Sequence, residues 1–329
     1  GFFAKLGAYK YFVFTDFKEV SDSTEEPWME LCEKLQGTGH RNLKTELDKI
    51  RYKKLHDLLR EFVNVETFEK FVTERKDEKK KNPVSKFYRI IADRYQNFIQ
   101  ELSRLEGVED INRDISDLFI RDLIAVIDLP RYKLKEYDMQ ADDYLQKNLS
   151  ANRYYLFMIL GFAAGARLSM VTLPLNDGPK SNELFRKYGL EGVFSELFEK
   201  DGMTAFHSGS IVKHIRAFIY YQNWWRHYET EELPEKLMKE VFSDRNMMEI
   251  LQMNEYEGTT WFNKEFFEDF MAGLFVISVL EILRNIDKVS ERKKEFKNRY
   301  RIISNLLISA GKAEYSVDRF MKEMDKLSM

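Results

Sequence analysis

Helical periodicity runs through almost the whole chain, and it limits the fold more than any other feature of the sequence. Apolar residues recur every three or four positions over long stretches, as on one face of an α-helix. Two clear examples near the C-terminus are Phe296, Tyr300, Ile303, Leu307 and then Val317, Phe320, Met324, Leu327. Alternating strand patterns are scarce, and the 329 residues include only six prolines. The sequence therefore predicts an all-α fold.

We expect a multihelical protein with about a dozen helices around a central buried helix. The first helix begins near Pro27 and ends before Gly37, because proline favours a first helical turn and glycine a helix end. The other expected ranges are roughly 41–63, 66–76, 84–105, 110–127, 138–150, 152–172, 182–200, 206–229, 234–253, 263–285, 296–309 and 315–327.

The central helix is predicted from the longest apolar run, Tyr154 to Ala166, which Arg167 interrupts. This run is shorter than the roughly 20 residues that a membrane-spanning helix needs, so we interpret it as a core helix and expect no membrane segment. Gly161 and Gly165 stand four residues apart within it. This spacing predicts that a neighbouring helix approaches closely.

A highly charged run from Glu74 to Pro83 predicts a boundary between an N-terminal helical subdomain, 1–76, and a main helical domain, 84–329. One continuous domain over 1–329 is the alternative. Composition says little about partners, because 52 basic and 55 acidic groups leave a formal charge of only −3. That balance favours neither nucleic acid nor an anionic membrane as a partner. One cysteine, Cys32, and no visible signal peptide predict a cytoplasmic location.

Motifs for cofactors and metals are missing from the sequence. No glycine pattern has the strand and helix context of a phosphate-binding loop, and no CxxC or HExxH motif indicates zinc. His207 and His214 are seven residues apart, two turns along one helix, which is too far for them to share a metal without other ligands. We therefore expect neither a cofactor nor a metal.

Two enzymatic alternatives depend on His56. Arg51 precedes His56 with the Arg-x4-His spacing of HEPN-type ribonucleases, which are all-helical and form a composite site at a dimer interface. His56 and Asp57 also resemble the His-Asp pair of metal phosphohydrolases, with His40 upstream. Either resemblance would make Arg51, His56 or Asp57 a catalytic residue.

The segment 254–275, NEYEGTTWFNKEFFEDFMAGLF, combines a helix start with unexplained aromatic and acidic residues. Asn263 is expected to cap a buried apolar helix, with Phe262 packed against Phe267. Capping does not account for the residues ahead of it, which are typical of a loop that contacts a ligand or another domain. We therefore select Glu255, Tyr256 and Trp261 as ligand-binding candidates.

Residues 251–283, LQMNEYEGTTWFNKEFFEDFMAGLFVISVLEIL, resemble the helical C-terminal region of large bacterial α-amylase-superfamily glycoside hydrolases. The segments LFRKYGLEGVFSELF at 184–198 and EYSVDRFMKEM at 314–324 are similar to the same region. Together these segments cover about a fifth of the chain.

The resemblance implies a non-catalytic accessory domain in carbohydrate metabolism. The superfamily's catalytic residues are an Asp nucleophile and a Glu acid on a β/α barrel. This chain shows no barrel pattern, and Ser169 stands where the resemblance would place the nucleophile. The implied partners are a glycoside hydrolase catalytic domain, on which the chain would dock, and an α-glucan. Flat side chains that could contact sugar rings are Tyr221, Trp224, Trp225 and Trp261.

Overall fold

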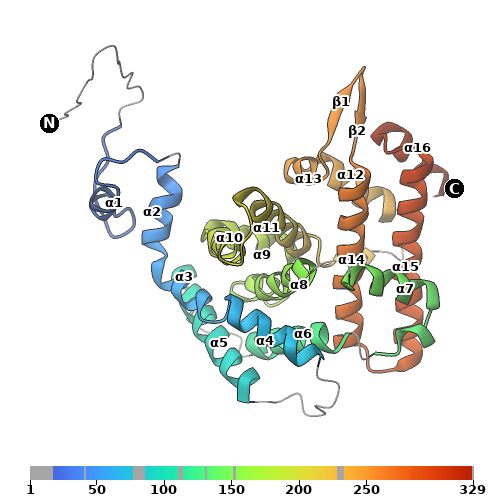
Figure 1. Ribbon diagram of the computed structural model, residues 1–329, viewed down its shortest axis with the longest axis horizontal. Coiled ribbons are helices and arrows are strands. Elements are labelled where there is room, and N and C mark those ends of the chain that lie inside the picture. Colours follow the sequence, from blue (N-terminus) through green and yellow to red (C-terminus); the bar gives the residue numbers. More distant parts are fainter. Residues whose placement is uncertain are drawn as a thin grey trace. The chain divides into compact units, whose positions relative to one another are not determined.

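A computed structural model describes residues 18–40, 42–76, 86–109, 114–129, 132–150, 153–227 and 233–327. It is all-α and 76% helical, which confirms the predicted fold class (Figure 1). Contacts within the chain divide it into two compact units, Gly1–Lys53 and Lys54–Met329. The boundary predicted in the charged run stays a prediction, because residues 77–85 lie outside the described residues.

The first unit contains the helices α1 (Trp28–Leu35) and α2 (Leu43–Arg51). Glu46 of α2 is buried, and its carboxylate lies 2.9 Å from Lys34 Nζ on α1 and 2.7 Å from Lys49 Nζ. His40 Nε2 lies 3.6 Å from the same carboxylate. One buried acid thus ties the two helices together. Cys32, the single cysteine of the sequence, is exposed on α1.

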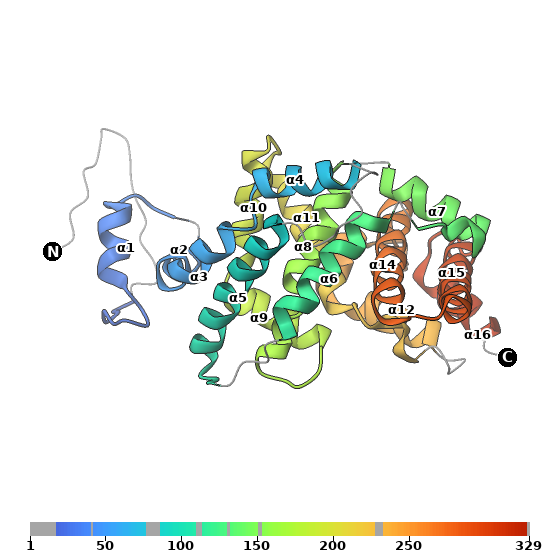
Figure 2. The same cartoon turned by 90° about the horizontal axis from the view of Figure 1, so that it is seen from below.

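The second unit begins in α3, and its elements follow in chain order: α3 (Lys53–Arg60), α4 (Val65–Lys76), α5 (Lys86–Glu106), α6 (Asp114–Asp128), η2 (Leu134–Glu136), α7 (Met139–Ser150), α8 (Arg153–Gly165), η3 (Leu168–Val171), α9 (Gly178–Lys187), α10 (Leu190–Lys200), α11 (Ala205–Tyr220), η4 (Trp224–His227), α12 (Leu233–Ser243), α13 (Arg245–Ile250), β1 (Asn254–Tyr256), β2 (Thr259–Trp261), α14 (Lys264–Asn285), α15 (Val289–Lys312) and α16 (Val317–Leu327). Along one side of this unit, α5 packs on α6, α6 on α14 and α14 on α15 (Figure 2).

The predicted central helix is α8. The segment Tyr154–Val171, which contains most of α8 and continues through η3, is apolar enough to cross a membrane by length and composition, but 89% of it is buried inside the protein. Helices α6, α7, α9 and α11 pack against α8. These neighbours take the place that lipid would occupy around a spanning helix, so the segment is a core helix.

Close packing of α11 on α8 confirms the interpretation of the two glycines. A Cβ atom on Gly161 would lie 2.6 Å from Ile215 Cδ1, and one on Gly165 would lie 2.4 Å from Ile219 Cδ1. Real Cβ contacts are not this short, so a side chain at either position would displace the isoleucine that packs there. The glycines let α11 approach the core helix directly.

Five of the expected long helices are interrupted. The range 41–63 breaks at Tyr52, the range 182–200 at Gly189, and the range 234–253 at Asp244. In the ranges 152–172 and 206–229 the α-helix ends at Gly165 and at Tyr220, and the separate 3₁₀ turns η3 and η4 follow. Gly189 has φ = +62°, which ends one helix and opens the next, and the Asp244 side chain caps α13. The described residues consequently form more helices than the dozen expected.

A short β-hairpin precedes α14, where the sequence predicts a loop. β1 and β2 pair antiparallel, with Glu255 opposite Thr260. Glu257 and Gly258 form the turn with φ = +49° and +72°, and positive φ at both central residues marks the tight turn that suits a hairpin. Asn263 then caps α14, accepting from the N–H groups of Glu265 and Phe266, so the expected cap is confirmed.

Candidate functional site

Three of the aromatic residues selected from the sequence are buried. Tyr221, Trp224 and Trp225 are only 5 to 6% exposed. Trp224 Nε1 donates to the Leu274 carbonyl at 3.0 Å, and the Arg299 guanidinium lies 4.5 Å from the centre of the Trp225 ring. Their surfaces pack against the protein itself, so they offer no open platform for a sugar ring.

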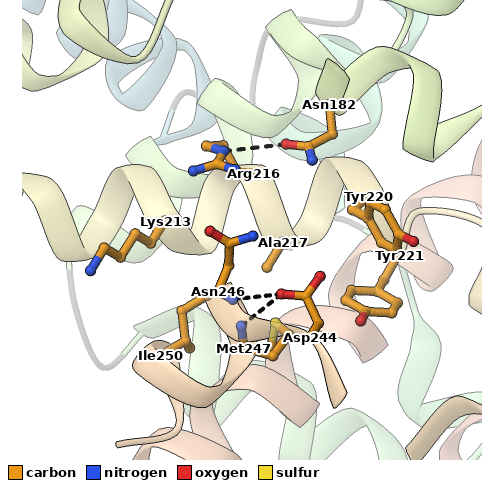
Figure 3. Close-up of a pocket in the computed structure, with 10 residues that line it drawn as sticks. All are labelled: Asn182, Lys213, Arg216, Ala217, Tyr220, Tyr221, Asp244, Asn246, Met247 and Ile250. Atoms are coloured by element: carbon orange, nitrogen blue, oxygen red, sulfur yellow. Dashed lines mark hydrogen bonds between the residues drawn. The ribbon is translucent and has the colours of Figure 1, made fainter. Parts of the chain in front are cut away.

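Tyr221 lines a narrow pocket between α9, α11 and α13 (Figure 3). In this pocket Arg216 donates to Asn182, and the Asp244 carboxylate accepts from the backbone of Asn246 and Met247. The space measures about 20 Å³, which is enough for one water molecule. A sugar does not fit there.

The other selected residues lie on the hairpin. Glu255 and Tyr256 are exposed, Tyr256 to 66%, whereas Trp261 is half-buried with Arg319 of α16 5.8 Å from its ring centre. Adjacent residues of a strand point to opposite faces, so Glu255 and Tyr256 do not converge. The hairpin precedes the first residue of α14, and Leu274, whose carbonyl accepts the Trp224 hydrogen bond, lies roughly 15 Å further along the axis of that helix. The structure therefore does not gather the six candidates into one site.

His56, the centre of the enzymatic alternatives, is buried in α3. Its Nε2 lies 2.7 Å from the Tyr188 carbonyl oxygen, and because a carbonyl can only accept, Nε2 donates. Burial lowers the pKa of His56. Asp57 pairs with Arg60 at 2.9 Å, and Arg51 lies on the separate helix α2. This geometry gives the ribonuclease and phosphohydrolase alternatives no support.

A different part of the second unit has the geometry of a binding site. A cavity of about 750 Å³ lies where α8, α11 and α14 begin, and we call it the α8–α11–α14 cavity. The residues that line it are Asn148, Tyr154, Tyr155, Met158, Gly202, Met203, Thr204, His207, Ser210, Ile211, His214, Phe266 and Asp269. Its volume lies in the range of about 300–1,000 Å³ that is typical of small-molecule sites.

Local helix geometry positions the polar groups of this cavity. Thr204 caps α11, and its side chain accepts from the His207 N–H. His207 therefore lies in the first turn of α11, and His214 follows two turns later on the same helix. Phe266 and Asp269 lie in the first two turns of α14, which Asn263 caps. Two capped helices thus present their first turns to one cavity.

The two histidines of the cavity differ in how far their hydrogen bonds fix the ring. Thr204 Oγ1 accepts from the His207 backbone N–H at 3.3 Å and also lies 2.8 Å from His207 Nδ1, a hydrogen bond in which either atom can donate. His214 Nδ1 donates to the Ser210 carbonyl at 2.9 Å. Burial lowers the pKa of His214 and keeps this ring neutral, which leaves its Nε2 as an acceptor.

Tyr155 contributes its ring to the wall of the cavity, whereas its hydroxyl is enclosed in the protein. Its side chain is nine-tenths buried, and its Oη has no partner among the described residues. Burial raises the pKa of this phenol well above its ordinary value, so the group keeps its proton. Because the oxygen has almost no accessible surface, a ligand in the cavity contacts the ring and not the hydroxyl.

Asp269 is the single acid among the residues that line the cavity. Its side chain is exposed to the cavity, but the surrounding protein reduces its solvation and raises the pKa of the carboxyl. No hydrogen bond or ion pair involves it among the described residues, and the lining contains no Lys or Arg. His214, the basic residue that acts on the pKa of Asp269, is itself neutral for the reason given above.

This arrangement is suited to binding a neutral polar molecule. Two-carboxylate glycoside hydrolysis needs a second acid, which the described lining lacks. No group of three or more His, Cys, Asp or Glu side chains able to hold a metal ion occurs in the part of the chain that the structure describes. The sequence gives His207 and His214 but no sign that Tyr154, Tyr155 and Asp269 join them, because three separate helices supply the site.

Comparison of the chain with protein-family models, with curated proteins and with solved structures gives no match. The resemblance to the helical region of α-amylase-superfamily hydrolases therefore remains a prediction from the sequence. What the structure establishes is an all-α protein with a sizeable cavity at the start of three helices.

Proposed function

We propose that this chain is a non-catalytic helical domain, accessory to an α-amylase-superfamily glycoside hydrolase, and that the α8–α11–α14 cavity binds the end of an α-glucan. The observation that carries the ligand assignment is the lining of the cavity, which combines aromatic rings with neutral donors and acceptors and contains no basic side chain.

Sugar hydroxyls both donate and accept hydrogen bonds, and the cavity offers both functions. The Ser210 hydroxyl and the Asn148 amide can donate, whereas His214 Nε2 and Asp269 are acceptors. The rings of Tyr154 and Phe266 supply flat apolar surface for the faces of a sugar ring. A site built from such groups discriminates strongly against ligands that lack the hydroxyls.

The hydrolase partner is supported by the resemblance of residues 251–283, which form the hairpin and most of α14. Within that segment, the turn at Glu257 and Gly258 closes the hairpin, and the Asn263 side chain caps the start of α14. Phe266 and Asp269 belong to the same segment and line the cavity. The segment that carries the resemblance thus also contributes to the proposed glucan site.

Isothermal titration calorimetry with maltotriose tests the ligand assignment, with cellotriose as the isomeric control that differs only in linkage. Asp269→Asn removes the charge of an acceptor without changing the shape of the side chain, and we expect it to weaken maltotriose binding about tenfold, the usual effect of losing a charged hydrogen bond. Asp287 is the matched control, because it is exposed and lies outside the cavity lining. Asp287→Asn should bind maltotriose normally.

Absence of heat with maltotriose in the unsubstituted protein would remove the glucan assignment. Equal weakening by Asp269→Asn and Asp287→Asn would mean that the effect is general and that the cavity is not the site.

A further inference from the structure

A second pocket, separate from the α8–α11–α14 cavity, opens beside the C-terminal half of α14. It measures about 190 Å³ and lies between α6, the loop after η3, η4 and α14. Its floor is a buried ion cluster. Asp122 of α6 accepts from Arg167 Nε and Nη2 at 3.0 and 3.1 Å, and from Arg284 Nη1. Two guanidinium groups therefore share a single carboxylate.

The charges around this pocket do not balance. Arg167, Arg226 and Arg284 line it, together with the acids Asp122 and Glu281. Glu281 lies 2.7 Å from Arg299, which is itself 3.8 Å from Glu295. With those two residues included, the described part of the cluster holds four guanidinium groups and three carboxylates, which leaves one positive charge in excess among these residues. Arg226 supplies that excess, because its side chain is exposed and makes no hydrogen bond or ion pair among the described residues.

Arg284 shows the same imbalance from inside the cluster. Its side chain is 10% exposed, and burial lowers the pKa of its guanidinium; Asp122 opposes this effect and the neighbouring Arg167 adds to it. Burying a cation without full compensation costs several kcal/mol. An anion that entered the pocket would offset part of this cost.

The remaining lining indicates what kind of anion fits. Asn223 and Asn285 bring amide groups to the pocket, whereas Trp225, Leu175 and Leu280 give it apolar walls. A net charge of +1 matches a monoanion, and apolar walls favour a ligand that carries carbon as well as charge. The volume is below that of most small-molecule sites, so the ligand is small.

We propose that this pocket binds the carboxylate of a small organic acid, with Arg226 and Arg284 contacting the carboxylate and the alkyl part against Trp225. Guanidinium groups match carboxylates in both charge and geometry. Arg226 is the adjustable contact, because it is exposed and unengaged, whereas Arg284 is fixed by Asp122. The proposal is independent of the glucan assignment, since the two sites share no lining residue.

Thermal unfolding in the presence of butyrate tests this proposal, because a ligand that binds the folded state raises Tm. Butyramide is the uncharged control of the same shape, and chloride and inorganic phosphate at equal ionic strength are the controls for general anion effects. We expect butyrate alone to raise Tm beyond chloride. Butyrate titration of Arg226→Gln should give binding about tenfold weaker, since a charged hydrogen bond is lost.

Arg226→Gln changes an exposed side chain and should leave the fold intact, and Arg301→Gln on the exposed side of α15 is the matched loss of one positive charge. Butyrate binding in Arg301→Gln should equal that of the unsubstituted protein. Equal shifts with butyrate and butyramide, no shift with butyrate, or undiminished binding in Arg226→Gln would each overturn the proposal.

Discussion

Asp269 illustrates how a single residue can serve binding at the expense of stability. Its carboxyl lines the proposed glucan site and has no counter-ion among the described residues. Because the protein around it reduces its solvation, the pKa is raised in the folded state. The fold thus holds this carboxylate where it is incompletely solvated and unpaired, but still open to a ligand.

Asp269→Asn should therefore increase stability at neutral pH and weaken maltotriose binding. The pKa of Asp269 is higher in the folded state than in the unfolded state, so the folded protein binds the proton more tightly. As the pH rises from the unfolded-state pKa through the folded-state pKa, ionisation of this carboxyl lowers the stability of the folded protein. The gain of Asp269→Asn should be largest at pH 7 and should disappear near pH 3, where both states are protonated.

Chemical unfolding at a series of pH values measures this difference. Asp287→Asn, at an exposed position in the turn after α14, is the control and should show little change. A lower stability of Asp269→Asn at pH 7 would mean that the carboxylate is stabilised by its surroundings, contrary to this account.

Individual residues also show where sequence-based prediction ends. Asn263 is identified as a cap because capping depends on its near neighbours in the chain. Trp225 cannot be identified as buried in this way, since its cover comes from Arg299, which is 74 positions later in the sequence. The cavity has the same origin, because Tyr155, His214 and Asp269 meet through the packing of three helices.

Among the elements, α14 depends most on close packing. Fourteen of its residues are buried, which leaves no broad polar face. Gly273 lies at its contact with α11, where an added Cβ would be 2.0 Å from Phe218 Cζ. Phe218 is itself fully buried, so its ring cannot move into solvent.

Gly273→Ala should consequently destabilise the protein by about 1–3 kcal/mol or more, the usual cost of overpacking a core. The matched control is Gly192→Ala in α10, where nothing lies within 4 Å of an added Cβ. There alanine should raise stability by about 0.5–1 kcal/mol, because it favours the helix more than glycine does. Urea unfolding measures both, and equal effects in the two variants would contradict the packing argument.

Element types are predicted better from this sequence than element boundaries. Long periodic stretches such as 263–285 correspond closely to single helices. The hairpin is missed because its strands have three residues each, too few to show alternation, and its turn is Glu-Gly rather than Asn-Gly or Asp-Gly. The interruptions at Tyr52 and Asp244 lack a glycine or proline signal, so a helical pattern continues across them.

At the scale of the whole molecule, the two compact units differ in how they are stabilised. The second unit has an extensive apolar core around α8, whereas the first is short and depends on the Glu46 cluster. Hydrogen bonds from Lys49 and Lys34 lower the pKa of Glu46 to about 2, although burial acts in the opposite direction.

Acid should therefore weaken the first unit before the core of the second. A depressed folded-state pKa contributes stability that is present above the unfolded value of 4.5 and is lost as pH falls toward about 2. Glu46→Gln should remove this contribution at pH 7 and make the first unit less sensitive to acid. Hydrogen exchange at α1 and α2 between pH 6 and pH 3 tests this expectation. Unchanged protection in Glu46→Gln would show that the cluster does not hold the unit.

The exposed Cys32 on α1 gives a practical route to following that unit separately. As the sole sulfhydryl of the sequence, it accepts a maleimide fluorophore at a defined position without further mutagenesis. A dye there would report on the N-terminal helices. With Trp28 of α1 replaced in Trp28→Phe, the remaining tryptophans Trp224, Trp225 and Trp261 all belong to the larger unit, and their emission would follow that unit. Two colours in one sample would then show whether the two units melt together or in sequence.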